Sequence, residues 1–294
     1  MTVFFVFVFK GSLLYLFYKN FGYYNENSFK GFVMLLGVNI DHIAVLREAR
    51  KINDPNPLDA LNICKLSGAD QITIHLREDR RHINDNDAKN IIKLSTLPVN
   101  LECSINDDII DIVCKLKPHR ATLVPENRDE VTTEGGLDLK NNFEKIKKAI
   151  EKLHKHEIEV SLFVDPTKEA IDLSSKLKVE WIELHTGSFA NIYAMLYSNL
   201  NNSVHSIKEL ELSRKELKKL LSVSLKNIKT SSKEAKKLGL KVAAGHGLNY
   251  QNVSLITGIK AVKELNIGQS IIARSVFTGL QNAIVEMKNC IKGV

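Results

Sequence analysis

The stretch ITIHLREDRRHI, residues 72–83, joins an apolar run directly to a run of ionisable side chains. Its first half, with Ile72 and Ile74, has the β-branched, apolar composition of a buried strand. Its second half is ionisable at every position from Arg77 to His82. A buried strand that ends in such side chains is typical of parallel sheets whose carboxyl edge carries a functional site.

The same pattern, an apolar run and then polar residues, recurs eight times after residue 34. The runs are rich in Val, Ile and Leu with weak alternation, as expected of strands buried on both faces, at residues 35–41, 71–76, 99–103, 121–126, 160–165, 181–187, 241–247 and 264–269. Helical patterns occupy residues 57–67, 84–95, 106–116, 141–156, 167–177, a long stretch near 206–238, 250–262 and 270–291. The repeat predicts an α/β fold, a (β/α)8 TIM barrel with extra helices. A doubly wound open sheet is the alternative, but no G-x-G-x-x-G follows the first strand.

Composition narrows the class of partner. The formal net charge of +7 comes from lysines spread along the predicted helices, which indicates solvated helix faces more than a nucleic-acid surface. Anionic small substrates suit this charge equally well. The four cysteines form no C-x-x-C pair and none lies near histidines at zinc spacing. We therefore expect no metal site, no disulfide framework and a cytoplasmic location.

Residues 1–34 differ in composition from the rest of the chain. They hold eight of the twelve phenylalanines, yet no positively charged region precedes the run TVFFVFVF, as a signal peptide would require. Lys10 and Gly11 interrupt that run too early for it to span a bilayer. We expect residues 1–34 to be an N-terminal extension, either disordered or a mis-assigned start, before a single catalytic domain at residues 35–294.

Polar side chains stand at the carboxyl end of every predicted strand, where the active site of a (β/α)8 barrel lies. They are Asn39, Asp41, His42, His75, Arg77, Glu102, Glu126, Asp165, Glu183, His185, His246 and Asn266. Glu102 ends an otherwise apolar strand, and burial would raise the pKa of its carboxyl to that of a usable base. His75 ends the preceding strand, so we expect it beside Glu102, a pair suited to proton transfer at carbon next to a carbonyl. An ion pair between Glu102 and Arg77 is the structural alternative.

A phosphate site is predicted at the loops after the seventh and eighth strands, where barrels often bind phosphate with the help of a helix N-terminus. Gly247, Gly268 and Gln269 would offer backbone N–H groups there. His246 stands between Gly245 and Gly247, and glycine on both sides indicates close approach of the backbone to a ligand.

A second anion site is indicated after the second strand, because the planar guanidinium group matches phosphate oxygens. Its candidates are Arg77, Arg80, Arg81 and His82, and Arg47 or Arg50 after the first strand could also reach a phosphate. Within this loop we expect Glu78, Asp79, Arg80 and Arg81 to brace one another through ion pairs and not to touch substrate. The stretch EVTTEGGLD, residues 130–138, is either a loop that closes over ligand or an ordinary surface turn. Two anion sites around one proton-transfer centre indicate that two phosphorylated substrates are joined.

The motifs GVNIDHIAVLREAR, ITIHLREDRRHI, VPENRDEVTTEGGLD, VSLFVD, ELHTG, AGHGLNYQNV and ELNIG occur in this order between about Leu35 and Met287. Together they resemble the pyridoxine 5'-phosphate synthases of the deoxyxylulose-dependent vitamin B6 pathway. The resemblance implies a (β/α)8 barrel that assembles as a homo-octamer and needs no metal or organic cofactor. It also implies condensation of 3-amino-2-oxopropyl phosphate with 1-deoxy-D-xylulose 5-phosphate, with release of phosphate and water.

The resemblance implies roles for individual residues. His75 and Glu102 match the family's proton acceptors, His246 its proton donor, and Glu183 a residue that stabilises the transition state. The positions that match contacts to the aminoketone phosphate are Asn39, Arg50, Gly247, Gly268 and Gln269. Those that match contacts to the deoxyxylulose phosphate are Asp41, His42, Arg77, His82 and Thr132.

Three features depart from the family pattern. Gln269 stands where the family usually has histidine, so phosphate binding there would depend more on backbone N–H groups. Residues 188–237 are longer and richer in lysine than expected, which indicates a helical elaboration at a subunit contact or a solvated surface. The N-terminal extension has no counterpart in the family.

Two other functions compete with this reading. Another phosphosugar enzyme on the same barrel, an aldolase or epimerase, would need a Schiff-base lysine at a strand end or a cluster of metal ligands, and no predicted strand ends in lysine. A protein that binds nucleic acid through the lysine-rich helix would show affinity that falls steeply with salt.

Overall fold

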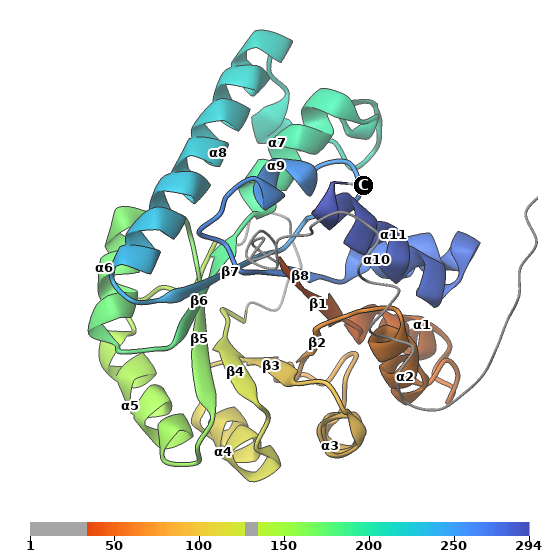
Figure 1. Cartoon of the computed structure of the whole chain (residues 1–294), viewed down its shortest axis with the longest axis vertical. Coiled ribbons are helices and arrows are strands. Elements are labelled where there is room, and N and C mark those ends of the chain that lie inside the picture. The colour runs from red at the N-terminus through yellow and green to blue at the C-terminus, as the bar shows by residue number, and fades with distance from the viewer. Residues whose placement is uncertain (1–33, 127–134, 294) are drawn as a thin grey trace, which may run out of the picture. The chain divides into compact units, whose positions relative to one another are not determined.

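The computed structural model describes residues 34–126 and 135–293. Within them, eight parallel strands pair in sequence order and close into a barrel, as Figure 1 shows. The strands are β1 (Leu35–Asn39), β2 (Gln71–His75), β3 (Val99–Cys103), β4 (Arg120–Leu123), β5 (Glu159–Val164), β6 (Trp181–His185), β7 (Lys241–Gly245) and β8 (Glu264–Ile267). The predicted barrel is therefore confirmed, and each strand lies within about two residues of its predicted start.

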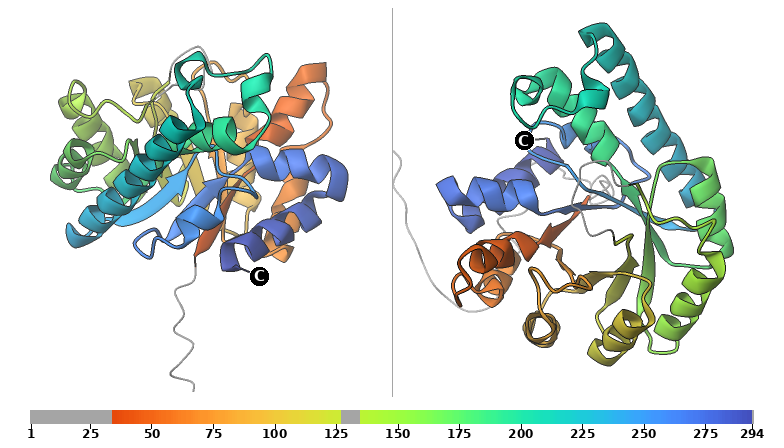
Figure 2. Two further views of the ribbon diagram at one scale, coloured as in Figure 1. Left: turned by 90° about the horizontal axis from the view of Figure 1, so that it is seen from above. Right: turned by 180° about the vertical axis from the view of Figure 1, so that it is seen from behind.

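Helices surround the strands on the outside of the barrel (Figures 1 and 2). They are α1 (Asp41–Arg50), α2 (Ala60–Leu66), α3 (Asp85–Leu94), α4 (Asp107–Leu116), α5 (Phe143–His154), α6 (Lys168–Lys176), α7 (Gly187–Tyr197), α8 (Arg214–Lys237), α9 (Ser254–Thr257), α10 (Gln269–Thr278) and α11 (Leu280–Lys292). Short 3-10 turns cover Pro57–Asp59, Leu200–Asn202 and Lys208–Leu210.

Four helix predictions need correction. The sequence patterns missed α1 and α7, which each begin within two residues of a strand end. The segment predicted at 250–262 forms only the single turn of α9. The segment predicted at 270–291 is two helices, because Gly279 has a φ of 76° and ends α10. The long lysine-rich segment is one 24-residue helix, α8, whose N-terminus carries a capping box between Ser213 and Glu216.

The two faces of the barrel strands differ sharply in polarity. The outward side chains, such as Ile72 and Ile74 on β2, are fully buried against the helices. The inward side chains are polar and bond across the interior, where Thr73 Oγ1 donates to Asn266 Oδ1 at 3.3 Å and Gln71 Nε2 to Glu264 Oε1 at 3.1 Å. Burial on both faces was predicted correctly. Apolar residues face the helices and mostly polar ones fill the barrel, and residues of both kinds are buried.

A buried ion pair closes the end of the barrel at which the strands begin. Arg120, the first residue of β4, donates from Nη1 to Glu264 Oε1 at 2.7 Å, and both side chains are almost fully buried. The Arg120 guanidinium also lies 3.8 Å from the centre of the Trp181 ring, a cation–π arrangement. These contacts fill the lower barrel, so the space for a ligand lies at the opposite end, where the strands finish.

The predicted N-terminal extension lies outside the described residues apart from Met34, which is buried at the start of β1. In residues 34–126 and 135–293, no helix has the length and apolar content that a bilayer crossing requires.

Candidate active site

The polar strand ends predicted from the sequence meet at one mouth of the barrel. His75 on β2 and Glu102 on β3 are direct partners in the strand register, so their side chains point to the same side of the sheet. This confirms that the two residues are lateral neighbours. It gives the site a base and an imidazole side by side.

Glu102 has a carboxylate with no hydrogen bond or ion pair among the described residues. The alternative pairing with Arg77 does not occur, because the Arg77 guanidinium contacts Asp79 at 3.3 Å. Burial raises the pKa of Glu102 well above its usual range, and the nearby carboxylates of Glu183 and Asp41 raise it further. A glutamate in this state holds a proton strongly once it has taken one, which suits a general base.

Glu183 is a second carboxyl group inside the barrel, on β6. Its side chain is 3% exposed and its Oε2 accepts a hydrogen bond from Asn266 Nδ2 at 2.6 Å. Burial, and then the nearby Glu264, raise the pKa of Glu183 to about 7, although the Asn266 bond opposes this. Glu102 and Glu183 are therefore two acids that cannot both ionise easily near neutral pH.

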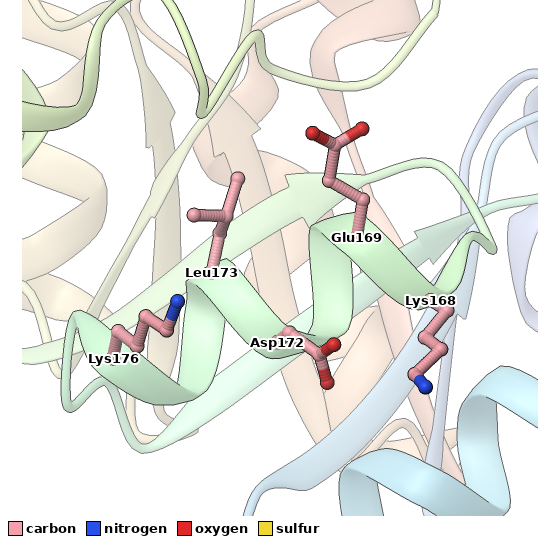
Figure 3. A pocket seen from close by; sticks show the side chains of 5 residues that line it. All are labelled: Lys168, Glu169, Asp172, Leu173 and Lys176. Carbon is pink, nitrogen blue, oxygen red and sulfur yellow. The ribbon is translucent and has the colours of Figure 1, made fainter.

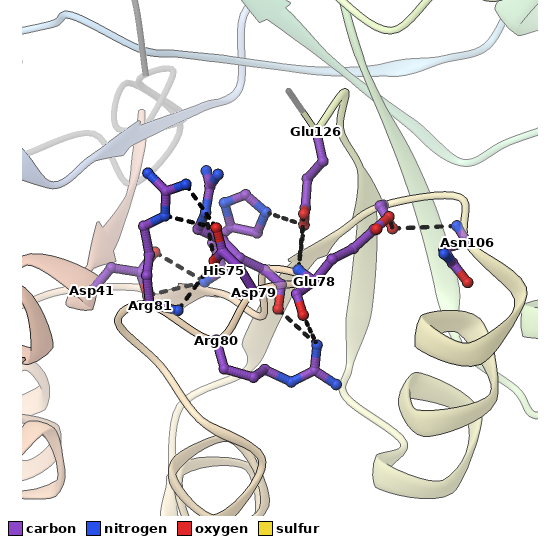
Figure 4. A network of polar contacts seen from close by, with 10 residues as sticks. Asp41, His75, Glu78, Asp79, Arg80, Arg81, Asn106 and Glu126 are labelled. Atoms are coloured by element: carbon purple, nitrogen blue, oxygen red, sulfur yellow. Dashed lines mark hydrogen bonds and ion pairs between the residues drawn. The ribbon is translucent and has the colours of Figure 1, made fainter. Parts of the chain in front are cut away.

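His75 is held from two sides, as Figure 4 shows. Its Nε2 lies 3.2 Å from Glu126 Oε1, and its backbone N–H donates to both carboxylate oxygens of Asp41 at 3.0 Å. Glu126 also accepts from the Glu78 backbone N–H at 2.8 Å. The sequence placed Glu126 at the mouth but gave no sign that it would orient His75, since the two residues are 51 positions apart.

Asp41 was predicted to contact substrate, and the structure gives its carboxylate a structural role. Besides the bond to His75, the Asp41 backbone N–H donates to Asn39 Oδ1 at 2.9 Å. Burial raises the pKa of Asp41 to about 6, against the opposing effect of His75. Asp41 thus joins the ends of β1 and β2 and adds a third acid beside Glu102.

The loop after β2 is braced by ion pairs, as predicted. Asp79 contacts both Arg77 and Arg81, and Arg80 Nε lies 3.1 Å from Asp85 Oδ2. Burial alone would raise the pKa of Asp79, but the hydrogen bonds from Arg81 and the charge of Arg77 lower it to about 2. Glu78 differs from the prediction, because its carboxylate accepts from the Ser104 hydroxyl at 2.6 Å and pairs with no arginine in the described part of this loop.

Two arginines predicted to reach a phosphate are placed elsewhere. Arg47 is 8% exposed and gives two hydrogen bonds, at 2.9 and 2.7 Å, to the carboxylate of Asp87 and one to the backbone carbonyl of His82. It is therefore a structural clamp on the β2–α3 loop, and the prediction for Arg47 was wrong. Arg50 is exposed at the last position of α1, about 14 Å along the helix from Asp41 at roughly 1.5 Å per residue.

The end of β7 brings His246 to the mouth in a rare backbone conformation, with a φ of 76°. Its side chain is exposed to the mouth, where its ring lies edge-on to that of His185 with centroids 5.0 Å apart. Burial of the ring face against β6, and then His185, lower the pKa of His246 to about 4. The imidazole is therefore neutral at pH 7 in the free protein.

The glycines beside His246 also have packing reasons, in addition to the predicted close approach to a ligand. A Cβ at position 245 would clash with the Glu183 carboxylate, and a Cβ at position 247 would lie 2.5 Å from Ala190 Cβ. Gly247 also has a φ of 81°, which favours glycine.

The predicted phosphate site lies at the N-terminus of α10. Gly268 precedes this ten-residue helix, and its carbonyl accepts from the N–H groups of Ile271 and Ile272, which leaves those of Gln269 and Ser270 without such a bond. A Cβ at position 268 would lie 2.8 Å from Asn39 Cβ, so the loops after β1 and β8 touch here. Asn39, Gly268 and Gln269 are therefore brought together as predicted.

The remaining predicted residues divide by position. His42 lies in the first turn of α1, and His82 lies in the loop between β2 and α3. Thr132, with most of the stretch 130–138, lies outside the described residues.

Other site types find little support among the described residues. No group of three or more His, Cys, Asp or Glu side chains there could hold a metal ion. None of the eight strands ends in lysine. A hollow of about 440 Å3 lies along α6 and is lined by Lys168, Glu169, Asp172, Leu173 and Lys176, none of which is a predicted site residue (Figure 3).

Comparison with known proteins agrees with the motifs. The family model "Pyridoxal phosphate biosynthesis protein PdxJ" matches residues 36–293. Pyridoxine 5'-phosphate synthase of Aliarcobacter butzleri (strain RM4018) is 80% identical over 259 residues, which cover 88% of this chain and 99% of that relative. The enzyme of the same name from Sulfurovum sp. (strain NBC37-1) is 65% identical over 256 residues, covering 87% and 99%.

Solved structures of other enzymes share the fold alone. N-(5'-phosphoribosyl)anthranilate isomerase from Pyrococcus furiosus has a TM-score of 0.52 at 14% identity, covering 89% of this chain and 100% of that one. The family resemblance of the sequence motifs is thus confirmed by relatives whose sequence identity is much higher than that of proteins that share only the fold. The chain belongs to the PdxJ family of pyridoxal phosphate biosynthesis proteins.

Proposed function

We propose that the protein forms pyridoxine 5'-phosphate by condensing 3-amino-2-oxopropyl phosphate with 1-deoxy-D-xylulose 5-phosphate, with release of phosphate and water. The observation that carries this proposal is the Glu102–His75 pair, a carboxyl of raised pKa beside an oriented imidazole, between two groups of anion ligands. Ring closure requires several proton transfers at carbons next to carbonyl groups, and this pair supplies two acceptors for them.

In this proposal Glu102 and His75 are the proton acceptors. Within residues 34–126 and 135–293 the Glu102 carboxylate has no hydrogen bond or ion pair, so it can approach a substrate carbon. The Glu126 carboxylate holds His75 in one orientation, and it stabilises the imidazolium that forms when His75 accepts a proton. Glu183, with a pKa of about 7, can hold a proton at neutral pH and donate a hydrogen bond to a developing oxyanion in the transition state.

The two phosphates bind at opposite sides of this pair. The aminoketone phosphate uses the N–H groups at the start of α10, with Gly247, Gly268, Gln269 and Asn39 around it, because a helix N-terminus favours an anion. Contacts to the deoxyxylulose phosphate come from His42, Arg77, His82 and Thr132, and Asp41, whose carboxylate binds the His75 N–H, lies beside them. α1 carries Arg50 away from the mouth of its own chain. Arg50 can therefore contact the aminoketone phosphate only if another element brings it to the mouth.

His246 serves as the proton donor after it has first gained a proton. Its pKa of about 4 leaves it neutral in the free protein, and a phosphate dianion bound nearby would favour the imidazolium form. Substrate binding thus favours protonation of His246, so this residue donates a proton only when substrate is present.

The chain acts as a transferase that self-associates into a homo-octamer in the cytoplasm, and it binds neither nucleic acid nor a membrane. Support for self-association comes from α10, where Val276 is 68% and Phe277 87% exposed, and from Leu46 on the neighbouring α1. Native mass spectrometry of the wild type and Phe277→Asp tests this, with an octamer and smaller species expected. A monomeric wild type would contradict it.

The direct test of function is to mix the protein with both phosphates and to follow pyridoxine 5'-phosphate and inorganic phosphate together. Equal amounts of the two products, formed only when both substrates are present, are expected. Release of phosphate without the pyridine product would contradict the proposed reaction.

A further inference from the structure

Asp165 and His185 form a pair at the barrel mouth that the proton transfers assigned above leave unused. Asp165 follows β5, His185 ends β6, and His185 Nδ1 lies 3.1 Å from Asp165 Oδ1. The hydrogen bond from His185 lowers the pKa of Asp165, although burial opposes it, so the carboxylate is ionised at neutral pH. Because a carboxylate only accepts hydrogen bonds, His185 donates from Nδ1 to Asp165.

The ring of His185 packs directly on His246. The two rings meet edge-to-face at 73° with centroids 5.0 Å apart, and Phe163 lies 5.0 Å from His185 and 6.2 Å from His246. Gly187 leaves room for this cluster, because a Cβ there would clash with His185 Nε2 and lie 3.0 Å from His246 Cδ2. The packed rings fix one side of His246. The other side of its ring is exposed at the mouth, where substrate can reach it.

We propose that His185, fixed by Asp165, is a positioning residue for His246, which it holds in place and whose uptake of a proton it restrains. This inference rests on the proposed role of His246 as proton donor. In the part of the chain that the structure describes, the ionisable groups around His246 are His185 and Glu183 on β6, the latter lying against Gly245, and Asp165 after β5, which acts through His185. The neighbours from α7, Gly187 and Ala190, carry no charge.

The anchor of this pair extends to the loop that precedes α5. Asp165 also accepts a hydrogen bond from the Gly136 backbone N–H, and the Leu137 N–H donates to the Phe163 carbonyl at 2.7 Å. The Asp165 carboxylate is therefore held by two elements, and this fixes His185 more firmly than a surface ion pair would.

The test compares His185→Phe and Asp165→Asn with the wild type. Phenylalanine keeps an aromatic ring packed against His246 but removes the ring nitrogens and hence the hydrogen bond to Asp165, while asparagine keeps the shape of Asp165. His154→Phe is the matched control, because His154 forms an equivalent pair with Glu180 at 3.2 Å away from the mouth. Thermal melts followed by circular dichroism verify that each variant folds.

We expect His185→Phe and Asp165→Asn to lower kcat about tenfold, less than the hundredfold or more typical of a general acid that touches substrate. KM for both phosphates should stay within about twofold, since neither residue is an anion ligand, and His154→Phe should behave as the wild type. Asp165→Glu should recover part of the rate, which a merely structural role would not predict. By NMR titration, the pKa of His246 should rise in His185→Phe.

An unchanged His246 titration in His185→Phe, or a kcat within about twofold of the wild type in both variants, would overturn the inference. The two proposals fail separately. A wild type that makes no pyridoxine 5'-phosphate would refute the proposed function, while the titration of His246 would still test its positioning by His185.

Discussion

Replacement of Glu183 by glutamine should make the protein more stable at alkaline pH while it impairs the enzyme. Burial raises the pKa of this carboxyl from 4.5 to about 7, so the folded protein keeps a proton that the unfolded chain has lost. Stability due to this group therefore falls as pH rises from about 4.5 to 7, and the full loss is present above pH 7. One pKa unit equals about 1.4 kcal/mol, so the loss is about 3 kcal/mol.

Glutamine removes this loss because it stays neutral and still offers an oxygen to Asn266 Nδ2. Urea unfolding of the wild type and Glu183→Gln at pH 5 and pH 8, at one protein concentration, measures the difference. We expect a gain of about 3 kcal/mol at pH 8 and less than about 1 kcal/mol at pH 5. The exposed Glu234→Gln on α8 is the control and should show no such dependence on pH. An equal gain at both pH values, or a loss at pH 8, would refute the reasoning.

Three further changes test other parts of the account. His75→Asn should lower kcat roughly a hundredfold, because the imidazole beside Glu102 is lost, and steady-state rates within a few fold of the wild type would exclude His75 as a proton carrier. Glu264→Gln removes the buried partner of Arg120 and leaves it only the longer, partly exposed contact to Glu159 at 3.9 Å, so it should cost about 3 kcal/mol in urea unfolding, and a cost below about 1 kcal/mol would contradict the buried pair. Gln269→His places a second donor that becomes cationic below about pH 6.5 at the start of α10, and should lower KM for the aminoketone phosphate there. A KM unchanged by pH in Gln269→His would remove this position from the phosphate site.

The strands were predictable because each is a short apolar run that ends in a polar side chain. Because the outward positions are all apolar, the sequence shows eight apolar segments even though the interior of the barrel is polar. The contacts among the inward side chains could not be predicted, since Thr73 and Asn266 meet only after the barrel has closed. A pattern of hydrophobicity along one strand carries no information about a partner on another strand.

The missed helices have a similar explanation. In α1 four apolar residues, 43–46, stand in a row between charged ones without a clear helical stripe, and α7 is apolar on nearly every side because it is largely buried. Both begin almost at once after a strand, so no loop of turn residues marks the boundary. These two helices are stabilised mainly by tertiary packing, which forms only when the whole chain folds.

The positions of the candidate site residues could be predicted from the sequence, but most of their hydrogen-bond and ion-pair partners could not. The neighbourhood of His75 and Glu102 followed from strand order alone, because adjacent strands in a barrel bring their ends together. The capture of Arg47 by Asp87 could not be foreseen, since both residues looked equally able to face solvent. The same holds for the pairing of Glu126 with His75 across 51 positions.

The most direct test of the central claim is the single-turnover rate of pyridoxine 5'-phosphate formation in the wild type and Glu102→Gln, with both phosphates saturating. Glutamine keeps the size of the side chain but cannot accept a proton from carbon. We predict a rate at least about a hundredfold lower in Glu102→Gln, with substrate affinities little changed. A variant that forms the product at nearly the wild-type rate would contradict the assignment of Glu102 as the base at the barrel mouth.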